Sequence, residues 1–227
     1  MEEHSKDAAI ISSWQKNVDA WTRAVRQSKI SSRVAVTDAA IVNAIVAQAP
    51  KTVLDLGCGE GWLVRSLTEL GVTAEGVDGI AGLIRRAKDG GGKFSLMSYE
   101  NFAAGAWQKH VDCVVCNFAL LGHQVVADVL AAIPSVLSID GKCIIQTLHP
   151  AYSDQSYYDG WREGSWAGFS DDFCDPAPWY FRTLSSWFAL FTASGFKLAE
   201  LIEPLNPQTG EPASIIFVLR PEKKVAA

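Results

Sequence analysis

Apolar residues recur along the chain in two patterns, short continuous runs and longer stretches with helical spacing. The short runs predict strands, and between them the spacing of Leu63, Leu67 and Leu70 is typical of the helices that alternate with strands. Such alternation indicates an α/β fold with a mostly parallel sheet. The predicted strands are 52–56, 72–77, 93–97, 111–116, 142–148, 196–202 and 213–219.

Two helical stretches are predicted before the first strand. The first, about 8–26, has one apolar stripe at i, i+4, i+7 and i+11, formed by Trp14, Val18, Trp21 and Val25. The second covers 37–48, with Thr37 as its N-cap. The first helix either docks on the sheet or acts as a lid that closes over a substrate and excludes water.

The first predicted strand leads into a glycine-rich turn, Asp55-Leu56-Gly57-Cys58-Gly59-Glu60-Gly61-Trp62. A strand, a glycine turn and a helix bring backbone N–H groups and a helix N-terminus close to a ligand. A dinucleotide fingerprint has glycine at the sixth position of this turn for close helix–strand packing, where this chain has Trp62. The Asp55 carboxylate would also repel a pyrophosphate. The turn therefore disfavours a nicotinamide dinucleotide.

An acid two residues before Gly-x-Gly-x-Gly resembles motif I of the class I S-adenosylmethionine (SAM) methyltransferases. The resemblance covers about 51–220 and implies a Rossmann-like, doubly wound α/β fold. Its sheet would have seven strands, mostly parallel, with the last strand antiparallel. The Trp-x-x-Asn helix and His149-Pro150 are similar to small-molecule methylases of the ubiquinone-biosynthesis type, methyltransferase domains 11 and 12. The cofactor implied is SAM, with S-adenosylhomocysteine (SAH) as product.

Acidic and polar residues at the ends of the next strands complete the expected cofactor site. Asp78, at the end of the second strand, can accept both ribose hydroxyls of an adenosine, although nicotinamide enzymes share this feature. The resemblance implies that Ile80 lies against adenine, and Arg33 is a candidate partner for the cofactor carboxylate. The expected cofactor-binding residues are Arg33, Asp55, Gly57, Gly59, Gly61, Trp62, Asp78, Gly79, Ile80, Ser98, Tyr99, Asn117 and Phe118.

The segment 151–182 is rich in aromatic residues and has neither helical nor strand periodicity. A long irregular loop inside a compact domain is usually functional. We interpret this segment as a cap over the substrate, a self-packed unit with its own aromatic core, or both. The expected acceptor-binding residues are Trp14, Asn17, Trp21, His123, Tyr152, Trp161, Trp166 and Tyr180.

Methyl transfer from a sulfonium requires alignment of the reacting atoms more than acid or base catalysis. A base is needed only if the acceptor must lose a proton, as a phenol or hydroxyl must. His149, which directly follows the fifth predicted strand, is the expected general base, and His123 is the second candidate. A structural role for His149, hydrogen-bonded to a loop, is the alternative.

Composition limits the remaining functions. The 227 residues, 48% of them apolar, suit one domain with an insertion. The expected parts are an N-terminal helical lid or extension at 1–50 and a SAM-binding domain at 51–220, which contains the aromatic insertion 151–182. The net charge of −5 disfavours nucleic acid, and no apolar run reaches the length of a membrane span. Five scattered cysteines indicate no disulfide framework. Cys113 and Cys116 would point to opposite faces of a strand, so no metal site is expected.

The expected function is therefore SAM-dependent methylation of oxygen or nitrogen in a small aromatic or apolar metabolite. Asn117-Phe118-Ala119-Leu120 lacks the paired prolines typical of relatives that methylate DNA or protein amides. We expect a cytoplasmic monomer or homodimer. A SAM-binding protein without transferase activity and a nicotinamide-dependent oxidoreductase are the alternatives.

Overall fold

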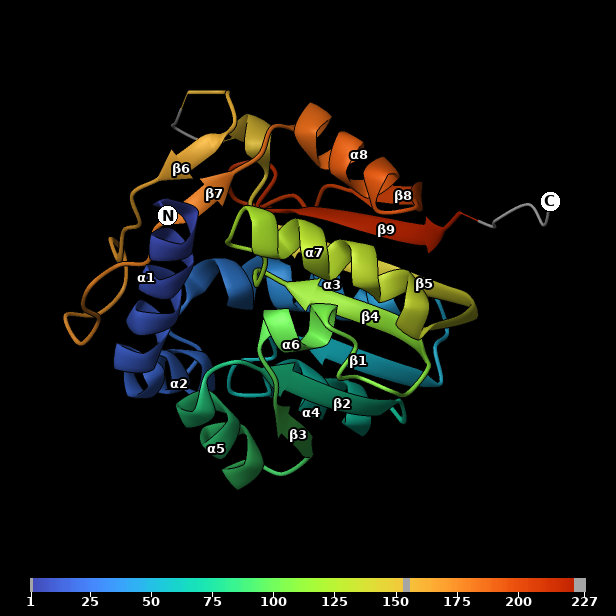
Figure 1. Cartoon of the computed structure of the whole chain (residues 1–227). Coiled ribbons are helices and arrows are strands. Elements are labelled where there is room, and N and C mark those ends of the chain that lie inside the picture. The colour runs from blue at the N-terminus through green and yellow to red at the C-terminus, as the bar shows by residue number, and fades with distance from the viewer. Residues whose placement is uncertain (1, 153–155, 223–227) are drawn as a thin grey trace.

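A seven-stranded sheet forms the centre of the computed structural model, which describes residues 2–152 and 156–222. The strand order is β3-β2-β1-β4-β5-β9-β8 (Figure 1). Strands β1 to β5 are parallel, whereas β9 is antiparallel to both of its neighbours. The predicted doubly wound fold with an antiparallel last strand is confirmed. The strands are β1 (Thr52–Leu56), β2 (Thr73–Asp78), β3 (Lys93–Leu96), β4 (Val111–Asn117), β5 (Leu137–Thr147), β8 (Phe196–Ile202) and β9 (Ile215–Pro221).

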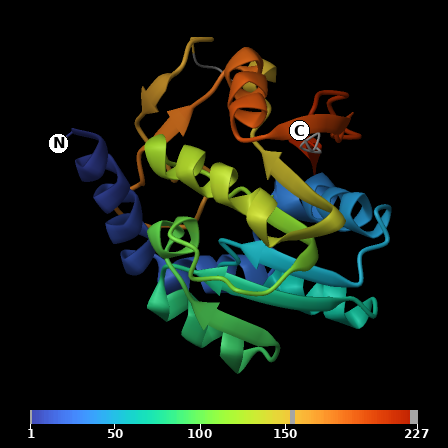
Figure 2. The same cartoon turned by 45° about the vertical axis from the view of Figure 1, so that its right-hand side comes forward.

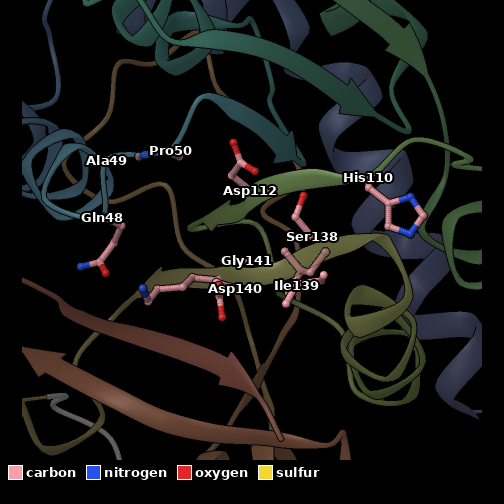
Figure 3. A pocket seen from close by; sticks show the side chains of 11 residues that line it. Gln48, Ala49, Pro50, His110, Asp112, Ser138, Ile139, Asp140 and Gly141 are labelled. Atoms are coloured by element: carbon pink, nitrogen blue, oxygen red, sulfur yellow. The ribbon is translucent and has the colours of Figure 1, made fainter. Parts of the chain in front are cut away.

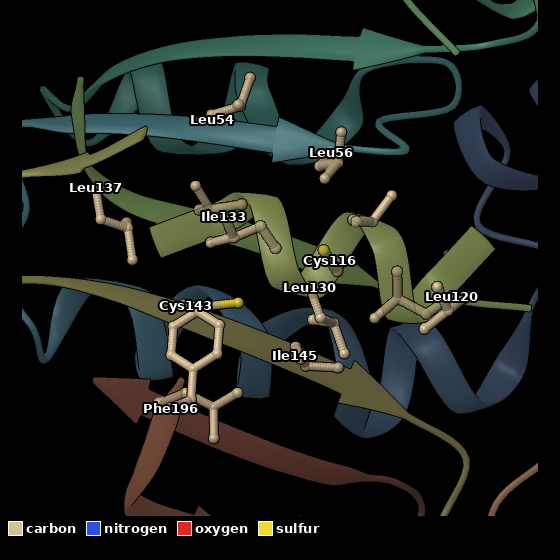
Figure 4. Packing of buried hydrophobic residues seen from close by; sticks show 14 of the residues in the cluster. Leu54, Leu56, Cys116, Leu120, Leu130, Ile133, Leu137, Cys143, Ile145 and Phe196 are labelled. Atoms are coloured by element: carbon tan, nitrogen blue, oxygen red, sulfur yellow. The ribbon is translucent and has the colours of Figure 1, made fainter. Parts of the chain in front are cut away.

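Helices cover both faces of the sheet because successive residues of each buried strand point to opposite sides (Figures 1 and 2). One face packs on α3 (Asp38–Val46), α4 (Trp62–Glu69) and α5 (Ala81–Asp89). The other packs on α6 (Tyr99–Ala103), α7 (Gln124–Ala132) and α8 (Leu184–Ala193). Leu130 of α7 lies over the second face beside Cys116 and Ile145 (Figure 4). Cys113 packs on the first face and Cys116 on the second, as their spacing predicted.

The order of the strands reverses at β1, which has β2 on one side and β4 on the other. In doubly wound sheets, ligands bind beyond the carboxyl ends of the strands at this point. Helices α1 (Glu2–Lys16) and α2 (Val18–Arg26) lie beyond that edge, as does a two-stranded ribbon of β6 (Gly160–Arg162) and β7 (Trp179–Phe181) (Figure 1). The N-terminal helices and the aromatic insertion therefore both face the predicted site.

The predicted single helix over 8–26 is wrong in one respect, because the helix breaks at Asn17. The backbone of this residue leaves helical geometry (φ −100°, ψ 12°) between α1 and α2. The predicted Thr37 N-cap is also wrong: a π-helical turn, η1 (Arg33–Thr37), runs straight into α3. Thr37 therefore has helical torsions, and its side chain makes no capping bond.

Strand β5 begins at Leu137, five residues before its predicted start. Helix α7 ends at Ala132 and gives way to a 3₁₀ turn, η2 (Ile133–Val136), which contains Pro134. Proline has no N–H to donate to an α-helix, so the chain leaves the helix here. Another 3₁₀ turn, η3 (Pro150–Tyr152), follows β5. Among the residues that the structure describes, no helix is long and apolar enough to cross a membrane.

Candidate active site

The glycine loop, residues 57–61, joins β1 to α4 at the switch point of the sheet. Gly57, Gly59 and Gly61 all have positive φ angles, 86°, 57° and 85°, which favour glycine. A Cβ atom on Gly57 would lie 2.5 Å from Ala119 Cβ and 2.6 Å from Tyr99 Oη. The loop is thus packed directly against the segments that follow β3 and β4.

Asp78 holds the glycine loop to the end of β2. Its Oδ2 accepts a hydrogen bond from Gly59 N (2.9 Å), and its Oδ1 accepts one from Ile80 N (2.8 Å). Burial raises the pKa of the Asp78 carboxyl, while these two N–H groups act in the opposite direction. Each carboxylate oxygen keeps a further acceptor site, which suits a pair of hydroxyls.

The segment after β3 lies beside Asp78. A Cβ on Gly79 would lie 3.6 Å from Ser98 Cα. Ser98 Oγ accepts a hydrogen bond from Asn101 N (3.2 Å) as the N-cap of α6. Tyr99 Oη donates to Ala119 O (3.0 Å). Both side chains therefore already have protein partners, and their assignment to adenine stays a prediction.

Asp55 is a buried carboxyl group at the end of β1, with 2% of its surface exposed. Burial and, second, the nearby Asp78 carboxylate raise the pKa of Asp55 to about 8. Among the described residues, neither effect is offset by a hydrogen-bond donor or a cation. A cationic ligand would supply the missing compensation.

The carboxyl ends of β4 and β5 carry unpaired polar atoms, and the residue after β4 has a strained backbone. Phe118 has φ 52°, and its N–H donates to Gln146 O (2.8 Å). Within residues 2–152 and 156–222, the buried atoms Asn117 Oδ1 and Gln146 Oε1 have no hydrogen-bond partner. Such buried acceptors call for a donor. Sequence analysis missed Gln146, although an amide in the apolar run 143–148 was a visible signal.

Trp21, Arg33 and Trp62 gather beside the glycine loop. The Arg33 guanidinium lies 4.6 Å from the Trp62 ring and 5.8 Å from the Trp21 ring. Its Nε donates to Asp38 Oδ1 (2.8 Å), which fixes the guanidinium plane. Trp21 Nε1 lies 3.4 Å from where a Cβ on Gly59 would be. The structure therefore places a predicted acceptor residue, Trp21, directly against the predicted cofactor loop.

The N-terminal helices pack against residues 165–175 of the insertion, and together we call these segments the cap. The fully buried Asn17 amide donates to Ser13 O (2.8 Å) and Cys174 O (2.7 Å) and accepts from Cys174 N (2.9 Å). These bonds give Asn17 a structural role. The cap has an aromatic core formed by Trp14, Trp21, Trp166, Phe169 and Phe173.

A second aromatic group joins the β6–β7 ribbon to the segment after β4. The His123 and Tyr180 rings stack with centroids 4.1 Å apart, and Trp161 meets Tyr180 edge-on at 5.6 Å. Tyr180 N donates to Leu121 O (2.7 Å), and Arg182 Nη2 donates to His123 O (2.8 Å). Three predicted acceptor residues are thus neighbours, and their contact with an acceptor stays a prediction.

His149 is buried, with 5% exposure, and both ring nitrogens have partners. Nε2 lies 2.7 Å from Glu203 Oε1, and Nδ1 accepts from Ala151 N (3.2 Å). The neutral ring then carries its proton on Nε2 and has no free lone pair for an acceptor. The predicted acceptor residue Tyr152 meets the ring edge-on at 5.0 Å. In this conformation His149 links the ends of β5 and β8, and its catalytic role stays a prediction.

His149→Ala should lower the melting temperature by about 2–8 °C, because two partly buried hydrogen bonds are lost. Turnover should change by less than about tenfold, since a general base usually contributes about a hundredfold or more. Glu203→Gln is the matched control and should show a smaller loss of stability. A hundredfold loss of turnover in His149→Ala, with SAM affinity unchanged, would instead establish the histidine as the base.

Two open hollows are lined by residues outside the predicted site. One, of about 800 Å³, is at the amino ends of β1, β4 and β5, lined among others by Pro50, Asp112 and Lys142 (Figure 3). The other, of about 1010 Å³, lies between α1, α6 and α7. Neither contains a predicted site residue. Within the described ranges, no group of three or more His, Cys, Asp or Glu side chains could hold a metal ion.

The fold and the glycine loop with its two buried acids define a class I SAM-dependent methyltransferase. The sequence profile of the methyltransferase domain family matches residues 30–201, and the chain belongs to this family. No protein of curated function matches the sequence.

Solved structures share the fold at low sequence identity. A 1,6-didemethyltoxoflavin-N1-methyltransferase from Burkholderia thailandensis, with its substrate and SAH bound, has a TM-score of 0.68 at 17% identity, over 97% of this chain and 91% of its own. The DhpI–SAH complex gives 0.66 at 16% identity, over 97% and 99%. The CcbJ methyltransferase from Streptomyces caelestis gives 0.61 at 17%, over 81% and 88%.

Proposed function

We propose that this enzyme transfers the methyl group of SAM to an oxygen or nitrogen atom of a small aromatic or apolar molecule. The observation that carries the proposal is the pair of buried carboxyl groups, Asp55 and Asp78, on either side of the glycine loop. Two fold relatives, solved with SAH bound, support the same cofactor.

The residues present fit each part of SAM. Asp78 would accept hydrogen bonds from the ribose hydroxyls, with Gly79, Ile80, Ser98 and Tyr99 around the adenine. The buried Asp55 would face the cationic methionine part of the cofactor. Within the part of the chain that the structure describes, Arg33 donates from Nε alone, to Asp38, so its terminal nitrogens suit the cofactor carboxylate.

When bound, SAM supplies a methyl group on an activated sulfur leaving group. The protein then has to hold the acceptor in line and keep water out. Asn117 and Phe118 stand at the end of β4, and the strained Phe118 backbone is typical of a functional site. Both ring nitrogens of His149 are hydrogen-bonded, one to Glu203 and the other to Ala151. Catalysis would therefore rely on alignment of the acceptor atom with the methyl group, and no residue is assigned as a base.

Aromatic side chains beyond the sheet edge support an aromatic or apolar acceptor. Trp161 and Tyr180 come from the ribbon, with His123 stacked on Tyr180. Trp14 and Trp166 come from the cap, where the two rings lie 5.9 Å apart. Flat rings of this kind bind apolar ligands through large contact areas.

Calorimetric titration should show SAM and SAH binding with a dissociation constant of about 10 μM or tighter, within the usual range for such ligands. NAD and NADP should show no binding at the same concentrations. A screen with methyl-labelled SAM would then compare phenols with anilines of the same ring, so that only the acceptor atom differs. Binding of a nicotinamide dinucleotide without SAM binding would contradict the proposal.

A further inference from the structure

Glu60, the residue between the last two glycines of the loop, is fully buried and makes ion pairs with two arginines. Arg65, on α4, donates from Nη2 to both carboxylate oxygens (2.7 Å each) and from Nη1 to Glu60 O (2.8 Å). Arg26, at the end of α2, donates from Nε to Oε2 (2.9 Å). The glycine loop is therefore held from two sides, and one side is an N-terminal helix.

The same helix contacts the loop at a second point. Trp21, one and a half turns before Arg26 on α2, has its Nε1 beside Gly59. The glycine beside Trp21 and the acid that Arg26 binds are consecutive residues, Gly59 and Glu60. A shift of α2 that broke the Arg26–Glu60 pair would therefore also move the Trp21 ring from the loop.

Helix α2 has another ion pair with the body of the domain, but that pair does not involve the glycine loop. Asp19 Oδ1 accepts from Arg86 Nη2 on α5 (2.7 Å), with both side chains about half exposed. By contrast, the Glu60 side chain is fully buried. A buried carboxylate depends on its partners far more than an exposed one does.

We propose that Glu60 is a positioning residue that couples cofactor binding to the N-terminal helices through its ion pair with Arg26. This inference rests on the proposed function, since it assigns to α2 a part in holding SAM. Arg26 fixes α2 against the loop, and Trp21 then closes over the cofactor beside Gly59. The cap thereby contributes to cofactor affinity as well as to the acceptor site.

The test compares Arg26→Gln with Arg86→Gln, which removes the ion pair of α2 that lies away from the loop. Arg65 still compensates Glu60 in Arg26→Gln, so the protein should fold. This variant should bind SAH about tenfold more weakly, within the usual range of coupling between sites. Arg86→Gln should bind SAH within about twofold of the wild type, as expected for an exposed pair.

A double-mutant cycle with Trp21→Ala identifies the route of the coupling. If Arg26 acts through α2 and Trp21, the double variant should bind SAH no more weakly than Trp21→Ala alone. Additive losses would overturn the inference, as would wild-type affinity in Arg26→Gln or equal losses in Arg26→Gln and Arg86→Gln. A wild-type protein that binds neither SAM nor SAH would overturn the proposed function and this inference with it.

Discussion

Asp78→Ala should weaken the binding of SAM and SAH by at least about a hundredfold, because hydrogen bonds to a charged group contribute about 1.5–3 kcal/mol each. The carboxylate of Asp78 is placed for two ribose hydroxyls, and alanine removes both acceptors. It also frees the N–H groups of Gly59 and Ile80, which shape the glycine loop. Calorimetric titration of the purified variant measures the loss.

Asp112 provides a matched control at the opposite edge of the sheet. Its Oδ2 likewise accepts two backbone N–H groups, from Lys51 (2.9 Å) and Thr52 (3.0 Å). Asp112→Ala should lower the melting temperature much as Asp78→Ala does, with SAM affinity unchanged. If both variants lost affinity equally, or if Asp78→Ala stayed within tenfold of the wild type, Asp78 would not hold the cofactor.

Asp55→Asn should make the protein more stable at pH 8.5 while weakening SAM binding. The folded protein holds the Asp55 proton up to a pKa of about 8, whereas in the unfolded chain the carboxyl ionises near its ordinary value of 3.8. The folded state binds more protons between these limits, so the contribution of Asp55 to stability falls as pH rises from about 4 to about 8. The asparagine side chain does not ionise, so Asp55→Asn does not lose stability as the pH rises.

The stability gain should therefore appear only at higher pH. Chemical denaturation should show the variant more stable than the wild type at pH 8.5 by several kcal/mol, with an upper limit of about 6 kcal/mol, since the pKa of Asp55 differs by about four units between the two states and each unit corresponds to about 1.4 kcal/mol. Near pH 4, where both side chains are neutral, the two proteins should be alike. A constant difference at both pH values would mean that titration of Asp55 is not the cause.

The weaker SAM binding of Asp55→Asn should be accompanied by a change in the number of protons released. A cation beside Asp55 favours the ionised carboxylate, so wild-type SAM binding at pH 7 should release close to one proton. Calorimetry in two buffers with different ionisation enthalpies measures this release, and Asp55→Asn should release less. The variant should also bind SAM about tenfold more weakly, as expected on loss of a close charge partner. Equal proton release by both proteins would place Asp55 away from the cofactor.

Structural features that depend on residues close together in the sequence could be predicted. The acid, the three glycines and the buried strand stand within one short stretch, so their chemistry and their geometry could be predicted together. Asp78 was predictable because the end of a parallel strand beside β1 must meet the same edge. The fold followed from these local patterns, and the prediction of a cofactor site rests on them.

Features that depend on distant partners were not predictable. The apolar stripe through Trp14 and Trp21 continues across Asn17 without interruption, so periodicity alone could not show the break. At the break, the Asn17 side chain binds Cys174, which lies 157 residues further along the chain. In the same way, nothing near His149 indicated Glu203, and the charge of Glu60 did not reveal which arginines would pair with it.

The cap also constrains the order in which this protein can be completed during synthesis. Basic residues of the N-terminal helices pair with acids of the insertion: Lys6 with Glu163, Lys16 with Asp175 and Arg23 with Asp172. The helices leave the ribosome before the insertion does, and the partners of Asn17 and these charges arrive only after most of the sheet has been made. Contacts of such long sequence separation form late, because a long loop must be closed first. A nascent chain that ends before residue 165 therefore presents the tryptophans of its first two helices without their partner segment, and is a natural client for a chaperone.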